Sequence, residues 1–148
     1  MIDSIKGCKA LGVNAVVIGA LHSDGSIDKD TARRLIDEAR PMKITFHRAF
    51  DECADPQKAL EDIIGLDCER LLTSGHEPDA FTGRFLIAAL VKQARGRIVI
   101  MAGGGVRPHN IARIEAETGA TEFHSSSHGP DGRTDRNIVK LLCDTSIK

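Results

Sequence analysis

The feature that most constrains the fold of this chain is a regular alternation of two kinds of segment. Short runs rich in β-branched residues recur at similar intervals, and each is followed by a segment with helical spacing. This alternation is typical of parallel βα units, in which a helix returns the chain to the start of the next strand. We therefore expect an α/β fold. The predicted strands are Asn14–Gly19, Lys43–His47, Arg70–Ser74, Arg97–Ala102 and Thr121–Ser125.

The segments between these strands carry helix signals. Asp28 is suited to cap the first of them and Pro41 to end it, while Asp55 and Pro56 begin the next. Gly65 suits the left-handed C-terminal position of that second helix. A later helix is expected to open at Pro108 and close at Gly119, and the other helical segments are residues 1–12, Phe81–Arg95 and Arg136–Asp144.

Two kinds of strand are predicted. Val16-Val17-Ile18 and Ile98–Met101 are nearly continuous apolar runs, as expected where a parallel sheet is buried on both faces. In Lys43–His47, by contrast, Ile44 and Phe46 share one face, and Thr45 and His47 share the other.

The last predicted strand repeats this alternation, because Phe123 opposes Glu122 and His124. If helices cover the apolar face, the polar residues line the other side of the sheet, where barrel folds place functional groups. The alternative is that these polar groups hydrogen-bond one another in a wet interior and bind nothing else.

A glycine run gives the clearest ligand signal. Gly103, Gly104 and Gly105 follow a buried strand, so their backbone N–H groups can approach a phosphate or carboxylate with no side chain in the way. The next strand ends at His124 and Ser125, which add further donors. The alternative reading is a tight turn without a ligand. The run lacks the G-x-G-x-x-G spacing of a dinucleotide site.

Three residues after the second strand are candidates for catalysis. His47 suits proton transfer, Arg48 suits an anion clamp, and Asp51 is close enough in sequence to orient either one. Thr73 and Ser74 end the middle strand and add hydroxyl groups to the same edge, either as ligand contacts or as turn caps. We include Glu122 with the anion-binding candidates.

Absences narrow the chemistry. No lysine lies at the carboxyl end of a predicted strand, which disfavours a Schiff-base aldolase, and no pair of carboxylates there suits glycoside hydrolysis. A convergence of His47, His124 and His128 on a metal is left open, but no local spacing supports it, so we assign no metal ligand.

Composition excludes other classes. The chain has 20 Lys and Arg against 21 Asp and Glu, a formal net charge of -1, without a basic stretch interleaved with aromatic residues. This disfavours nucleic-acid binding. Its apolar runs are far shorter than the roughly 20 residues that cross a bilayer, and no signal peptide is evident. Four cysteines lack Cys-x-x-Cys spacing, which disfavours a disulfide framework or structural zinc.

The motifs resemble, in order along nearly the whole chain, those of the CutC copper-homeostasis family. The segments that carry this resemblance are Gly19-Ala20-Leu21 with Asp24–Asp28, Thr45–Asp51, Leu72–Gly75, Gly96–Met101 with Gly103–Gly105, and Gly119–Ser125. The resemblance implies a TIM-like barrel, a cytoplasmic location and a role in copper handling.

The same resemblance implies that this chain is incomplete as a barrel. Its 148 residues match the family's strands four to eight, whereas a typical eight-stranded barrel has roughly 250 residues. We therefore expect residues 1–148 to form a single CutC-like domain, a partial TIM-like (β/α) barrel with about five parallel strands, lacking the first three βα units. The cysteines linked to copper in the family lie in the absent part, and none of the chain's own cysteines matches them, namely Cys8, Cys53, Cys68 and Cys143.

Three functional hypotheses remain open from the sequence. The first is copper homeostasis, with copper as the cofactor that the resemblance implies and its likeliest ligands outside this chain. The second is an enzyme acting on a small molecule that bears a phosphate or carboxylate, and the third is a nonfunctional fragment. Because the first and last strands of an open sheet have unpaired edges, we also expect poor solubility or homo-oligomers.

Overall fold

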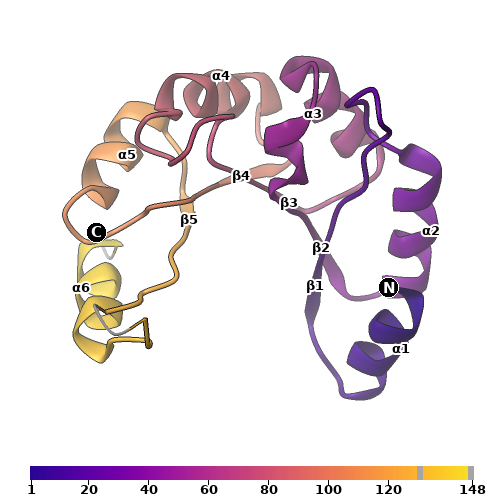
Figure 1. Cartoon of the computed structure of the whole chain (residues 1–148), viewed down its shortest axis with the longest axis horizontal. Helices are drawn as coiled ribbons and strands as arrows, with labels where there is room; N and C mark the ends of the chain where they lie inside the picture. Colours follow the sequence, from indigo (N-terminus) through magenta and orange to yellow (C-terminus); the bar gives the residue numbers. More distant parts are fainter. Residues whose placement is uncertain (130–131, 147–148) are drawn as a thin grey trace.

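The computed structural model describes residues 1–129 and 132–146, and Figure 1 shows a curved sheet with helices along its outer side. The sheet has five parallel strands in the order β1-β2-β3-β4-β5. The elements are α1 (Ile2–Ala10), β1 (Ala15–Ile18), α2 (Lys29–Ala39), β2 (Lys43–Phe46), the 3-10 helix η1 (Arg48–Glu52), α3 (Pro56–Gly65), β3 (Arg70–Thr73), α4 (Arg84–Ala94), β4 (Val99–Gly103), α5 (Ile111–Thr118), β5 (Glu122–His124) and α6 (Arg136–Ser146).

The predicted α/β fold with five parallel strands is confirmed. Strands follow one another in the sheet as they do in the sequence, which is the simplest arrangement of successive βα units. The register places Val16 beside Ile44, Leu71 beside Ile100 and Ala102 beside Phe123. This register brings the carboxyl ends of all strands to one edge of the sheet, which we call the rim.

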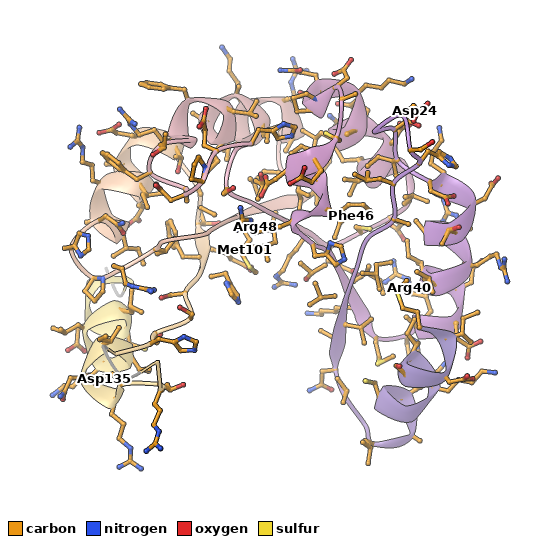
Figure 2. The ribbon with its side chains drawn as sticks, in the orientation of Figure 1. Asp24, Arg40, Phe46, Arg48, Met101 and Asp135 are labelled. Atoms are coloured by element: carbon orange, nitrogen blue, oxygen red, sulfur yellow. The ribbon has the colours of Figure 1, made fainter. Side chains whose placement is uncertain are left out.

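The core lies between the sheet and the helices. Ile44 and Phe46 are fully buried, as the alternation in β2 predicts, and Leu71 of β3 is fully buried beside them. Figure 2 shows Phe46 between the ribbon and the outer helices. Burying a side chain of this size contributes about 1.5 to 3 kcal/mol. The helices supply the opposite wall of the core with Leu35 and Ile36 from α2, Leu60 and Ile63 from α3, Ile87 and Leu90 from α4, and Ile114 from α5.

Local signals fix most helix ends as predicted. Asp28 accepts a hydrogen bond from the Thr31 N–H at 2.9 Å and begins α2. Asp55 caps α3 in the same way, with Pro56 in its first turn. Gly119 closes α5 in the left-handed region at φ 70°.

Three predicted helix ends were wrong, and at one of them a loop contact decides the end. Gly65 is the last residue of α3 but is not left-handed, and Asp67 takes that conformation at φ 63°. Pro108 lies in a turn before α5, because the Asn110 side chain accepts from the Arg107 N–H and donates to the Gly105 carbonyl. The fourth predicted helix begins at Arg84 rather than Phe81.

The concave side of the sheet differs from the expectation for β1. Val17 is 60% exposed, although its run of apolar residues predicts a strand buried on both faces. Val17 alternates with Ile18, which is buried under the helices, so Val17 faces the concave side of the sheet. Figure 1 shows no helix of the described residues over that side. Leu72 and Met101 are half-buried on the same side, and Figure 2 shows Met101 there.

Candidate functional site

The rim brings together the ends of β2, β3 and β4. Phe46 ends β2, and the chain turns at once into η1, which carries Arg48 and Asp51 toward the neighbouring strand. Thr73 ends β3 beside Ala102 of β4, and Gly103 ends β4. The candidate residues of three separate sequence motifs therefore meet at one place.

Asp51 is the hub of this cluster. Its side chain is only 6% exposed, and its carboxylate accepts hydrogen bonds from the Thr73 hydroxyl at 2.5 Å and from the Ser74 N–H at 3.1 Å. The His76 N–H adds a further donor at 3.3 Å. Burial opposes ionisation, but hydrogen bonds from Thr73, Arg48 and Ser74 outweigh it and hold the pKa of the Asp51 carboxyl below its ordinary value.

Arg48 is held by this carboxylate. Its Nε donates to Asp51 Oδ2 at 2.7 Å, and its Nη2 donates to Ser74 Oγ at 2.7 Å. Charge-assisted bonds of this length fix the plane of a guanidinium. Asp51 was predicted to orient either His47 or Arg48, and the structure shows that it holds Arg48.

His47 faces the first strand instead. Its Nδ1 accepts from the Ala49 N–H at 3.0 Å, so in the neutral ring the proton is on Nε2. The ring lies against Gly19, where an added Cβ would be 2.5 Å from the imidazole. A role for His47 in proton transfer stays a prediction, and Asp51 takes no part in positioning its ring.

The glycine run forms a bent loop beside Arg48. Gly104 and Gly105 have φ angles of 99° and 66°, a region that favours glycine. An added Cβ on Gly104 would lie 3.3 Å from Arg48 Nη1 and 3.2 Å from Ser74 Cβ. The predicted anion loop and the predicted anion clamp are therefore direct neighbours, although they are far apart in the sequence.

The residues around β5 divide into two groups. His124 is exposed next to Gly103, and Ser125 Oγ donates to the Val106 carbonyl at 2.8 Å, so both lie at the rim. Glu122 instead pairs through both carboxylate oxygens with Arg70 of β3, at 2.6 and 3.0 Å. Anion binding by Glu122 stays an untested prediction, and its observed contact is a cross-strand ion pair.

Two arrangements at the rim were not predicted from the sequence. Arg107 Nη1 lies 3.3 Å from both Ser125 Oγ and Ser126 Oγ, which adds a second guanidinium to the loop after β4. Its position two residues after the glycine run is a signal that would have found it. The second arrangement is Cys53 Sγ, 3.4 Å from Nε2 of His76.

Metal-ligand chemistry at the rim is sparse. In residues 1–129 and 132–146, no group of three or more His, Cys, Asp or Glu side chains is arranged to hold a metal. The convergence of His47, His124 and His128 that the sequence left open is not seen there. Burial raises the pKa of the Cys53 thiol to about 11, so this thiol stays protonated near neutral pH.

Comparison with known proteins identifies the family. The model of the CutC family matches residues 1–129, which is most of the chain. The chain belongs to the CutC family. A CutC protein of Parabacteroides distasonis is 57% identical over 127 residues, which cover 86% of this chain and 52% of that protein. One from Chromobacterium violaceum is 46% identical over 129 residues, covering 87% of this chain and 52% of that protein.

Solved structures agree with the family and the fold. The CutC protein of Streptococcus agalactiae, whose name refers to copper homeostasis, superposes with a TM-score of 0.79 at 31% identity. The match covers 83% of this chain and 60% of that one. The chain thus spans about half the length of the curated CutC relatives it matches. A phosphoribosyl anthranilate isomerase from Thermococcus kodakaraensis, at 18% identity and a TM-score of 0.62, shares the fold alone; its match covers 99% of this chain and 69% of that one.

Proposed function

We propose that this chain takes part in copper homeostasis as a portion of a CutC-type protein. The observation that supports this role is the family match over residues 1–129, together with the name of the solved relative from Streptococcus agalactiae. Because the chain spans about half of its relatives, the activity of the whole protein is carried over as part of the proposal.

The residues of this chain do not fit a closed copper site. Thiolate and imidazole groups are suitable copper ligands, and Cys53 with His76 is a close pair of that kind, although no group of three or more such side chains is arranged to hold a metal in the described residues. A pair leaves a metal short of the donors found in closed protein sites, and the raised pKa of Cys53 makes deprotonation costly. We therefore place the principal copper ligands outside this chain.

An anaerobic competition titration with a chromophoric Cu(I) chelator tests this placement. The intact relative from Parabacteroides distasonis is expected to retain Cu(I) at chelator concentrations that strip it from this chain. C53S removes the thiol of the close pair with His76 and so tests whether this pair binds Cu(I). C143S, at an exposed cysteine, is its matched control. Equal Cu(I) affinity for the chain and the intact relative would contradict the proposed location of the ligands.

Growth in elevated copper tests the role itself. In a bacterial strain that lacks its CutC gene and is copper-sensitive, the intact relative is expected to restore growth. If the intact relative leaves copper sensitivity unchanged, the proposed role in copper homeostasis fails, whatever the titration shows.

The last part of the proposal concerns the location of the chain in the cell. Among the described helices, none is long and apolar enough to cross a membrane. We place the chain in the cytoplasm on the strength of its resemblance to the CutC family, and separation of cell fractions with an antibody to the chain tests this.

A further inference from the structure

One edge of the Arg48 guanidinium is open. Nε and Nη2 are engaged by Asp51 and Ser74, whereas Nη1 has no hydrogen-bond partner within residues 1–129 and 132–146. The Arg48 side chain is 43% exposed, so this edge faces solvent at the rim. A planar guanidinium can bind an oxyanion through two parallel hydrogen bonds along one edge. The edge formed by Nη1 and the second proton of Nη2 is available for such a contact.

The open edge is already fixed in position. The buried Asp51 carboxylate holds Arg48 from one side, and Thr73 and Ser74 hold Asp51 in turn. A side chain ordered in this way loses little conformational entropy when a ligand binds. Asp51 also neutralises much of the charge of Arg48, so further donors are needed for tight binding of an anion.

The glycine loop supplies a further donor. The Gly104 carbonyl accepts from the Ala80 N–H at 2.9 Å, and the Gly105 carbonyl accepts from Asn110 Nδ2 at 2.9 Å. In a trans peptide the N–H points opposite to the carbonyl, so the Gly105 N–H is directed away from Ala80. The parallel pairing of Gly103 with His124 turns the Gly104 N–H toward the His124 carbonyl, whereas the Gly105 N–H donates to no group within the described part of the chain. A free backbone N–H in a bent glycine loop can bind an anion.

Space and surroundings agree with a bound ligand. The missing side chain at Gly104 leaves its backbone next to Arg48 Nη1, where a Cβ would be 3.3 Å away. Arg107 contacts hydroxyl and carbonyl oxygens, and it adds positive charge that no carboxylate of the described residues offsets. Below the rim, Leu72 and Met101 form a half-buried apolar surface on the concave side.

We propose that the open edge of Arg48 and the N–H group of Gly105 bind the phosphate or carboxylate group of a small organic molecule, next to the bare backbone of Gly104. Ser74 and Asp51 position Arg48 and do not contact the ligand. Leu72 and Met101 contact the ligand's organic part. This site is independent of the proposed copper role, because neither Arg48 nor Gly105 is a copper donor.

Isothermal titration calorimetry of the full chain tests the site, with inorganic phosphate as one probe and succinate as the other. Saturable binding of at least one probe is expected, together with shifts of the Gly104 and Gly105 amide resonances in a ¹H–¹⁵N spectrum. R48Q removes the open edge and is expected to weaken binding about tenfold or more. R97Q is the matched control, because Arg97 also pairs with a carboxylate, Glu61 of α3, but lies in the loop between α4 and β4.

The outcomes separate the possibilities. Binding of phosphate alone or of succinate alone supports the site and also assigns the class of ligand. Binding of both probes supports the site as well. Absence of saturable binding for both probes overturns it, as does equal weakening by R48Q and R97Q, which indicates unspecific charge attraction. If R48Q gives no folded spectrum, R48K takes its place: it keeps one positive charge but loses the fork, and unchanged affinity in R48K also overturns the proposal.

Discussion

The Asp51 hub gives the sharpest test of how the rim is built. In D51N the side chain keeps its shape but exchanges one carboxylate oxygen for an amide that donates hydrogen bonds. Both oxygens of Asp51 face donors, Thr73 on one side and Arg48 on the other, so either orientation of the amide opposes a donor. Hydrogen bonds to a charged group are worth about 1.5 to 3 kcal/mol each. Arg48 stays partly solvated, so we expect a loss of about 3 kcal/mol in the free energy of unfolding.

The effect of pH follows from the lowered pKa of Asp51. In the folded protein the pKa of this carboxyl lies below its ordinary value of 3.8, so the unfolded chain binds the proton more readily. The stabilisation is therefore fully present above the unfolded pKa and is lost as the pH falls through the folded pKa. The difference between wild type and D51N is expected to be constant above about pH 5 and to shrink below about pH 4.

Urea unfolding followed by far-ultraviolet circular dichroism measures this difference, since the chain has no Trp or Tyr for fluorescence. D62N is the control, because Asp62 pairs with exposed Lys29 and its loss is expected to cost about 1 kcal/mol or less. Unfolding of D51N at the same urea concentration as D62N would refute the role of Asp51 as a hub. A difference that persists unchanged to pH 3 would show that its charge is not responsible.

Two further predictions concern packing and assembly. Gly75 and Gly96 share a φ of 75°, but an added Cβ on Gly75 lies 2.3 Å from the Gly83 carbonyl oxygen, whereas nothing lies within 4 Å at Gly96. G96A is expected to cost about 1 kcal/mol and G75A about 3 kcal/mol or more, and equal melting temperatures would contradict this. Because Val17 is exposed and the edges of β1 and β5 are unpaired in the described sheet, light scattering is expected to show species larger than 16.0 kDa. A monodisperse monomer with a cooperative thermal transition would exclude that.

The fold was predictable because its signals are local and repeated. The alternation of Ile44 and Phe46 with Thr45 and His47 gives the two faces of β2, and the burial of Ile44 and Phe46 agrees with it. Helix ends were predictable where a side chain caps its own helix, as at Asp28. They were not predictable at Pro108, because Asn110 and the glycine loop set the start of α5.

The rim was only partly predictable. The sequence motifs placed His47, Arg48 and Asp51 at one strand end, but not which partner Asp51 would choose. That choice depends on Thr73 and Ser74, which are 22 and 23 residues away in the chain and become neighbours only when β2 and β3 pair. The ion pair of Glu122 was not predictable for the same reason, because its partner Arg70 lies 52 residues away in the chain.

The ion pair between Arg70 and Glu122 has a geometric consequence for the whole sheet. It joins β3 to β5 across the intervening β4, so it acts as the chord of an arc. A chord of fixed length sets the radius of that arc. The curvature of this sheet is therefore set in part by an ion pair within the chain itself.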